Sequence, residues 1–249
     1  MKIVVLGSSS SGNSTFVECG ETKFLIDAGF SYSYIKDRLF EFGVTPDQIY
    51  FILVTHAHND HVRCLHTFAR VFNTKIYIGE NTYKEYLKKE YLKNYEFIES
   101  ITDIDDIHID KIPISHDKSG YGFVITYKKE SLVYITDTGM IHSKYHSLLS
   151  NKEVYLIESN HDVEMEMHGS KDQMTKIRNI GDMGHLSNEQ CAMYLNHFIG
   201  NKTKYILLMH VSEHDNTYEL AYKVNRESID KKIPIYLSHI NENSEVIEL

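Results

Sequence analysis

The chain has 249 residues, of which 42% are hydrophobic, so it can bury a sizeable core and is not a disordered polypeptide. Its net charge of −9 argues against a general nucleic-acid binder with a basic surface, although it does not exclude a local binding site. The three cysteines are far apart and odd in number, which argues against a disulfide framework and for a reducing compartment. The apolar run after Met1 is too short for a signal peptide, and no window reaches the length of a membrane span. We therefore expect a soluble, cytoplasmic protein.

The beginning of the chain is predicted to be sheet, with strands at 2–6, 15–19 and 23–26. Between the first two, residues 7–14 read Gly-Ser-Ser-Ser-Ser-Gly-Asn-Ser and are expected to form a polar loop. Backbone N–H groups and hydroxyls of such a loop could bind phosphate, but no P-loop lysine follows. An ordinary turn explains most of the serines, and Asn13 is the residue that we expect to contact substrate.

The next part of the chain alternates between helical spacing and short apolar runs. The predicted elements are a helix at 31–42 capped by Ser31, a strand at 50–54, a helix at 61–72, a strand at 75–78 and a helix at 82–91. Lysines and tyrosines interleave in the last of these helices. That pattern can bind a nucleic acid, but a solvated lysine face over buried tyrosines explains it better.

A histidine cluster, Thr-His-Ala-His-Asn-Asp-His at positions 55–61, directly follows a predicted buried strand. Imidazole and carboxylate groups are ligands for zinc-like and manganese-like ions. His56 and His58 can close on one ion, whereas Asp60 and His61 suit a second. A histidine-rich surface loop is the alternative, and a metal site is favoured only if further ligands appear downstream.

Three such residues appear, each after an apolar strand-like run. His116 follows 112–115, Asp137 follows 132–136, and His210 follows 205–209. His239 also follows an apolar run and could compete with His210 for the last ligand position. The remaining predicted elements are strands at 121–127, 153–158, 234–237 and 246–249, a helix or turn at 161–168, and helices from Ser187 and at 216–226.

This pattern resembles the signature of the metallo-β-lactamase superfamily, most closely its YycJ (WalJ) group. The resemblance to that group rests on residues 7–14, on Glu-Ser-Asn-His-Asp at 158–162 and on Gly-His-Leu-Ser-Asn-Glu at 184–189. It covers nearly the whole chain. It implies an α/β fold, the αββα sandwich of two mixed sheets flanked by helices, in one domain at 1–249.

The resemblance also implies two divalent metal ions, Zn²⁺ or Mn²⁺ or Fe²⁺, and a hydroxide between them as the nucleophile. One ion would take His56, His58 and His116, and the other would take Asp60, His61 and His210, with Asp137 as the bridge. Asp60 and His185 are the expected catalytic residues.

His185 is the expected general acid, because related phosphodiesterases carry a histidine in the matching loop that is not a ligand. It directly precedes a helix N-terminus, where Ser187 and Gln190 form a capping box and anions are favoured. A simple neighbour of the cap is the alternative role. Glu158 and His161 could orient His185 or a ligand.

A basic segment at 170–180 precedes that loop. Lys176 and Arg178 in this segment are candidate phosphate contacts, and a solvated helix face is the alternative. Together with Asn13 and His161 they complete the candidate substrate-binding residues.

We therefore predict a dinuclear phosphodiesterase, and the resemblance points to a 5′→3′ DNA exonuclease. The alternative is a small-molecule hydrolase that acts on a cyclic or nucleotide phosphodiester or on a thioester. The Gly-His-Leu-Ser loop favours phosphodiesters. A flavodiiron-type sensor, the candidate from another class, would alter the metal loop. DNA is the expected partner and a membrane is not, and the oligomeric state is left open.

Overall fold

The structure is a computed structural model that describes residues 1–249. The strands are β1 (Lys2–Ser9), β2 (Gly12–Cys19), β3 (Thr22–Ile26), β4 (Phe51–Leu53), β5 (Lys75–Ile78), β6 (Tyr95–Phe97), β7 (Asp103–Ile104), β8 (Ile107–Pro113), β9 (Tyr121–Tyr127), β10 (Glu130–Ile135), β11 (Val154–Glu158), β12 (Tyr205–Met209), β13 (Ile235–Leu237) and β14 (Ile247–Glu248). The α-helices are α1 (Tyr32–Phe40), α2 (Asn59–Val62), α3 (Leu65–Val71), α4 (Glu80–Glu85), α5 (His146–Leu149), α6 (Val163–His168), α7 (Gln173–Ile180), α8 (Asn188–Phe198) and α9 (Tyr218–Ser228). Short 3-10 helices lie at Pro46–Gln48, Lys89–Tyr91, Ile98–Ser100 and Ser143–Tyr145.

Two compact units divide the chain. The first unit contains Met1–Ile109, Lys118–Tyr121 and His239–Leu249, and the second contains Asp110–Asp117 and Gly122–Ser238. Two seven-stranded sheets run in the orders β14-β1-β2-β3-β4-β5-β6 and β13-β12-β11-β10-β9-β8-β7. Both sheets are mixed and carry flanking helices, which confirms the predicted α/β class.

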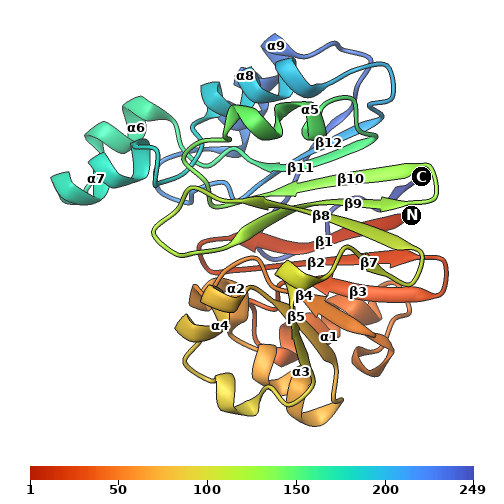
Figure 1. The fold of residues 1–249 in the computed structure, drawn as a ribbon. Coiled ribbons are helices and arrows are strands. Elements are labelled where there is room, and N and C mark those ends of the chain that lie inside the picture. Colours follow the sequence, from red (N-terminus) through yellow and green to blue (C-terminus); the bar gives the residue numbers. More distant parts are fainter. The chain divides into compact units, whose positions relative to one another are not determined.

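The first sheet is antiparallel from β14 to β3 and parallel from β3 to β6. Helices α1 and α3 pack on it (Figure 1) through a core that includes Leu39, Ile52 and Phe68, all fully buried. Each such side chain contributes roughly 1.5–3 kcal/mol by leaving water. This core anchors the end of β4, where the histidine cluster begins.

Three predictions in this unit are wrong. The helix expected at 82–91 ends at Glu85, and residues 89–91 form a separate 3-10 turn. Residues 7–14 do not form a loop, because β1 and β2 continue through them and pair Gly7 with Ser14 and Ser8 with Asn13. The helix predicted at 61–72 is interrupted between α2 and α3. The interruption has a tertiary cause: the N–H of Cys64 donates to the carbonyl of Ala28 instead of continuing a helix from His61.

In the second unit, the parallel strands β10 to β13 form the sheet centre and one side. Helices α5, α8 and α9 cover one face of this sheet, while α6 and α7 extend beyond that layer (Figure 1). Ser187 caps α8 with the predicted capping box, so that the preceding residue, Leu186, and His185 before it are fixed at a helix entrance. No helix is both long and apolar enough to span a membrane.

A buried ion-pair cluster holds α6 and α7 in place. The Lys171 ammonium lies 3.0 Å from Oε2 of Glu166 and 2.7 Å from Oδ2 of Asp215, and both carboxylates are buried. The amide of Asn179, on α7, donates to Oε1 of Glu166 at 2.8 Å. Partial burial alone would lower the pKa of Lys171, but its contacts with the two carboxylates raise it. Lys171 is therefore charged and links α6, α7 and the segment after β12.

Replacing Lys171 by methionine is expected to destabilise the protein by ~2–3 kcal/mol, because the buried Glu166 would lose its cation. The free energy of unfolding from urea titration measures this loss. Adding Glu166→Gln to the Lys171→Met variant should recover part of it, because the unpaired buried charge is then removed. A double variant no more stable than Lys171→Met would show that the ion pair is not the source of the stability.

Candidate metal centre

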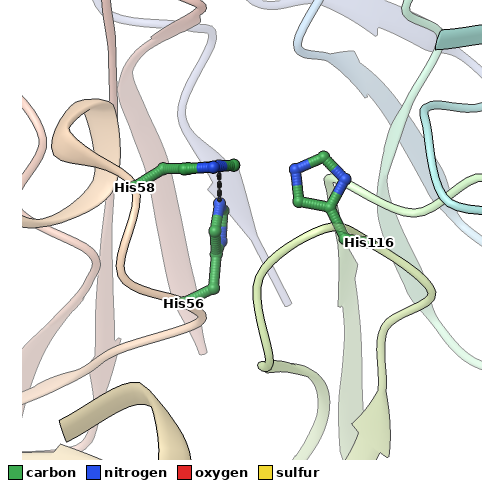
Figure 2. A group of neighbouring side chains, drawn as sticks. All are labelled: His56, His58 and His116. Atoms are coloured by element: carbon green, nitrogen blue, oxygen red, sulfur yellow. Dashed lines mark hydrogen bonds between the residues drawn. The ribbon is translucent and has the colours of Figure 1, made fainter. Parts of the chain in front are cut away.

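His56 and His58 lie on the loop after β4, and their rings meet nearly at right angles (Figure 2). Nε2 of His56 is 3.0 Å from Nδ1 of His58, and Nδ1 of His56 lies 3.1 Å from the hydroxyl of Thr55. The hydroxyl can accept a hydrogen bond from Nδ1–H of His56. In that tautomer the lone pair of the ring lies on Nε2. Two nitrogens about 2.0–2.1 Å from one ion can lie about 3 Å apart, so the pair fits a shared cation.

His61 is fully buried in α2, and Asp27 fixes its ring. Nδ1 of His61 donates to Oδ2 of Asp27 at 2.7 Å, and Asp27 also accepts from the N–H and the hydroxyl of Thr55, each at 2.8 Å. Burial raises the pKa of Asp27, whereas the contact with His61 opposes that rise. A carboxylate on Nδ1 leaves Nε2 as the ligand atom, the arrangement that orients histidines in metal sites.

Asn13 contacts two of the candidate ligands of the second ion. Its Nδ2 lies 3.0 Å from Nε2 of His61 and 3.3 Å from Oδ2 of Asp60, while its Oδ1 accepts from the hydroxyl of Ser8. Asn13 has no exposed surface. These contacts support a positioning role, and its contact with substrate stays a prediction.

The backbone of residues 27–29 packs directly against the loop that carries Asp60 and His61. Asp27 adopts a left-handed φ of 62°, and the N–H of Ala28 donates to the carbonyl of His61. A Cβ added at Gly29 would lie 1.6 Å from the carbonyl oxygen of Asp60. Only glycine therefore lets the end of β3 lie against the loop that presents Asp60.

Replacing Asp27 by asparagine is expected to weaken metal binding by ~10–100-fold, because the charged acceptor on Nδ1 of His61 is lost. Competition with a chromogenic chelator measures the affinity. The matched control is Asp106→Asn, an exposed carboxylate in the turn between β7 and β8. An unchanged affinity in Asp27→Asn would show that this carboxylate does not orient a ligand.

In the second unit, His116 lies on the loop after β8. Its Nδ1 donates to the carbonyl of Gly184 at 3.0 Å, which again leaves Nε2 as the available lone pair. Nε2 lies 3.2 Å from Oδ1 of Asp117 and 4.0 Å from Oδ1 of Asp137. His116 is buried, as the ring of a metal ligand is expected to be.

Asp137 and His210 follow β10 and β12 and have unusual backbone conformations. Their φ values are 57° and 52°, in the left-handed region that non-glycine residues rarely adopt. Oδ1 of Asp137 lies 3.7 Å from Nε2 of His210 and 3.8 Å from Nδ1 of His185. Such conformations cost of order 1–3 kcal/mol and are retained where a site requires them.

Glu158 contacts both His185 and His210 and is fully buried. Its Oε1 accepts from the N–H groups of Thr138 and Leu186, and its Oε2 lies 3.1 Å from Nδ1 of His185 and 3.4 Å from Nδ1 of His210. Burial alone would raise the pKa of Glu158, but the two histidines outweigh it and lower the pKa to about 2. Glu158 is therefore a carboxylate that holds both rings.

Ligand-type atoms of Asp137, Glu158, His185 and His210 all lie within 4.8 Å of one another. These donors, with imidazole and carboxylate groups in a buried setting, suit Zn²⁺, Mn²⁺ or Fe²⁺. In each unit a carboxylate or carbonyl fixes histidine rings through Nδ1. The residues present therefore fit a divalent metal.

The sequence matches the profile of the Metallo-beta-lactamase superfamily over residues 9–210, most of the chain. The chain belongs to this superfamily. The match spans the histidine cluster, Asp137 and His210. The chain is accordingly a metal-dependent hydrolase, as predicted.

Similar proteins agree with the superfamily assignment. Exodeoxyribonuclease WalJ of Streptococcus pneumoniae is 36% identical over 229 residues, which cover 89% of this chain and 85% of that protein. Exodeoxyribonuclease YycJ of Bacillus anthracis is 32% identical over 234 residues, covering 92% and 89%. The crystal structure of the metallo-beta-lactamase fold protein YhfI from Bacillus subtilis has a TM-score of 0.73 at 15% identity, covering 97% of each chain. The resemblance to the YycJ (WalJ) group is confirmed.

The remaining predicted site residues, His161, Lys176 and Arg178, and the competing candidate His239 do not belong to the groups of candidate ligands described above. His161 is fully buried, its ring nitrogens have no hydrogen-bond partner, and burial lowers its pKa. Lys176 donates to the carbonyl of Met167, and Arg178 pairs with Asp117 at 3.2 Å. The His239 side chain is 40% exposed and lies 4.0 Å from Glu242, unlike the buried His210. These positions favour His210 as a ligand over His239.

Sequence reasoning missed the role of Asp27 and left that of Glu158 open. Both are buried acids at the end of an apolar run, after β3 in one case and at the last position of β11 in the other. A buried carboxylate is costly unless it is paired, so an acid that ends an apolar run is itself a signal in a metal-binding superfamily. Its partner histidine could not be read from spacing.

Proposed function

We propose that this protein is a dinuclear metal-dependent phosphodiesterase that acts on DNA as a 5′→3′ exonuclease. The observation that carries the proposal is the set of buried histidines whose Nδ1 atoms are held by Asp27, Gly184 and Glu158 in a metallo-β-lactamase chain. The relatives' name of exodeoxyribonuclease supports DNA as the substrate class.

The superfamily pattern assigns the ligands. His56, His58 and His116 would hold one ion, Asp60, His61 and His210 the other, and Asp137 would bridge them. Bound divalent ions would supply a hydroxide nucleophile near neutral pH, because a metal ion lowers the pKa of the water that it binds. The metal identity is Zn²⁺, Mn²⁺ or Fe²⁺ by donor chemistry.

His185 is suited to protonate the leaving oxygen. Its side chain is 13% exposed, and Nδ1 donates to the Glu158 carboxylate, which orients the ring. Its backbone N–H donates to the carbonyl of Asn179 at 2.9 Å, which fixes the loop. Nε2 then carries the proton that the leaving alkoxide needs. Asp60 would orient the attacking water as well as bind metal.

Arg178 and Lys176 would contact the phosphate backbone. Asp117 and Asn179 accept from three of the N–H groups of Arg178, and the guanidinium still has others for a phosphate. His161 has no exposed surface, so we assign it to the packing behind His185.

The test compares the purified protein loaded with Mn²⁺ or Zn²⁺ on 5′-phosphorylated duplex DNA, on RNA and on bis-p-nitrophenyl phosphate. Release of mononucleotides from the 5′ end of the duplex is the expected result. Hydrolysis of the small diester without cleavage of DNA would instead favour a small-molecule phosphodiesterase. Metal analysis of the same preparation should find two ions per chain, and a single ion at saturation would contradict the two-metal assignment.

A further inference from the structure

Helix α7 turns its apolar side to solvent. Met174 is 79% exposed and Ile177 is 60% exposed, although an apolar pair three residues apart is normally the buried side of a helix. Arg178, one turn from Met174 on the same side, has a half-exposed side chain. We call Met174, Ile177 and Arg178 the α7 stripe. Two large apolar side chains on one exposed face, next to a cation, are a candidate binding surface.

The stripe is rigidly attached to the proposed catalytic loop. The carbonyl of Asn179, in the last turn of α7, accepts from the N–H of His185, and Arg178 pairs with Asp117, beside His116. The Lys171 cluster holds the same helix from its other side through Asn179. A ligand on the stripe would therefore lie at a fixed position relative to His185.

The free positive charge beside the stripe fits a polyanion as the partner. Of the three cations in residues 171–178, Lys171 is neutralised by Glu166 and Asp215, so that Lys176 and Arg178 supply this charge, in a chain with a net charge of −9. The one acid in this segment, Asp172, is occupied as the N-cap of α7, where it accepts from the N–H and hydroxyl of Thr175. Apolar side chains beside cations match a nucleic-acid strand, whose bases need an apolar surface and whose phosphates need positive charge.

We propose that the α7 stripe binds unpaired bases at the end of the DNA substrate. Met174 and Ile177 contact the faces of the bases, as methionine and isoleucine do where proteins unstack DNA, while Arg178 binds the adjoining phosphate. This inference rests on the proposed nuclease function and deepens it: the substrate is a duplex end whose terminal bases separate from their partners before cleavage.

The test is the double variant Met174→Gln/Ile177→Gln, in which glutamine keeps helix propensity and removes apolar surface. The ratio of kcat/KM on 5′-phosphorylated duplex DNA to kcat/KM on bis-p-nitrophenyl phosphate should fall about tenfold, through KM, at the low end of what base contacts contribute. Met193→Gln, at a methionine on α8 that is 57% exposed, is the matched control and should leave the ratio unchanged.

A second arm removes the bases instead of the side chains. For the unaltered protein, DNA whose terminal nucleotides are abasic should lose about the same factor, whereas the double variant should be nearly indifferent to the missing bases. Equal losses in both proteins, or an unchanged ratio in the double variant, would overturn the proposal. If the double variant has a different molecular mass in light scattering but the same ratio, the stripe is a contact between copies of the chain. That outcome also overturns the proposal.

The nuclease proposal is tested separately in the unaltered protein. If that protein hydrolyses the small diester but no DNA, the proposed function fails before any variant is compared. If it degrades DNA and the double variant keeps the ratio, only the role of the stripe fails.

Discussion

Replacing Asp137 by asparagine is expected to abolish nearly all activity and to reduce the bound metal. Asp137 is the proposed bridging ligand, and its Oδ1 lies within 4.0 Å of His116, His185 and His210 in the second unit. An amide has nearly the same shape but no charge, so three histidine rings would remain around a neutral oxygen. The rate on DNA should fall by at least ~10³-fold, because loss of the bridge affects nucleophile formation and charge stabilisation together.

Metal content is measured by inductively coupled plasma mass spectrometry on the same samples as the rate. It shows whether a loss of activity comes with a loss of metal. Fewer than two ions per chain with no activity supports a bridging role. Asp106→Asn, the exposed control, should keep both the metal and the rate. If Asp137→Asn keeps full metal content and activity within about twofold, Asp137 is not a ligand and this chain does not follow the ligand pattern of the superfamily.

Replacing His185 by alanine is expected to keep the metal and the fold while lowering the rate on DNA by ~10²–10⁴-fold, the usual contribution of general acid catalysis. The physical reason is the leaving group. The alkoxide that leaves from DNA is strongly basic and needs a proton, whereas p-nitrophenolate leaves readily without one. The loss on bis-p-nitrophenyl phosphate should therefore be much smaller than the loss on DNA.

The comparison of the two substrates is the measurement that matters for His185. Equal losses on both would indicate a binding role at the entrance of α8 instead of proton donation. Because Oε2 of Glu158 lies 3.1 Å from Nδ1 of His185, Glu158→Gln should show the same dependence on the leaving group. A loss of metal in His185→Ala would place His185 among the ligands, together with Asp137, Glu158 and His210.

Where local chemistry is sufficient, the sequence predicted structure to the residue. The strands Lys75–Ile78, Tyr121–Tyr127 and Tyr205–Met209 were predicted with the bounds that they have. The N-caps Ser31 and Ser187 were predicted because a capping hydroxyl acts within three residues of its own position. The histidine cluster was found for the same reason, since four of its ligand candidates lie within six residues.

Predictions were wrong where distant segments compete with local preference. The serines at 7–14 favour a turn, but the partner strand offers hydrogen bonds that extend β1 and β2 through most of them. The apolar stripe of 61–72 favours one helix, but the carbonyl of Ala28 takes the N–H of Cys64 and interrupts it.

The sequence by itself determined the superfamily, because residue type, order and spacing carry the resemblance, and that resemblance implied the ligands and His185 as the expected acid. Only the tertiary structure decided which acids hold the rings. Asp27 and His61 are 34 residues apart, and so distant a contact has no signature in spacing. The left-handed φ values of Asp27, Asp137 and His210 were equally hidden, because aspartate and histidine only tolerate this conformation better than most residues, and the packing around the site imposes it.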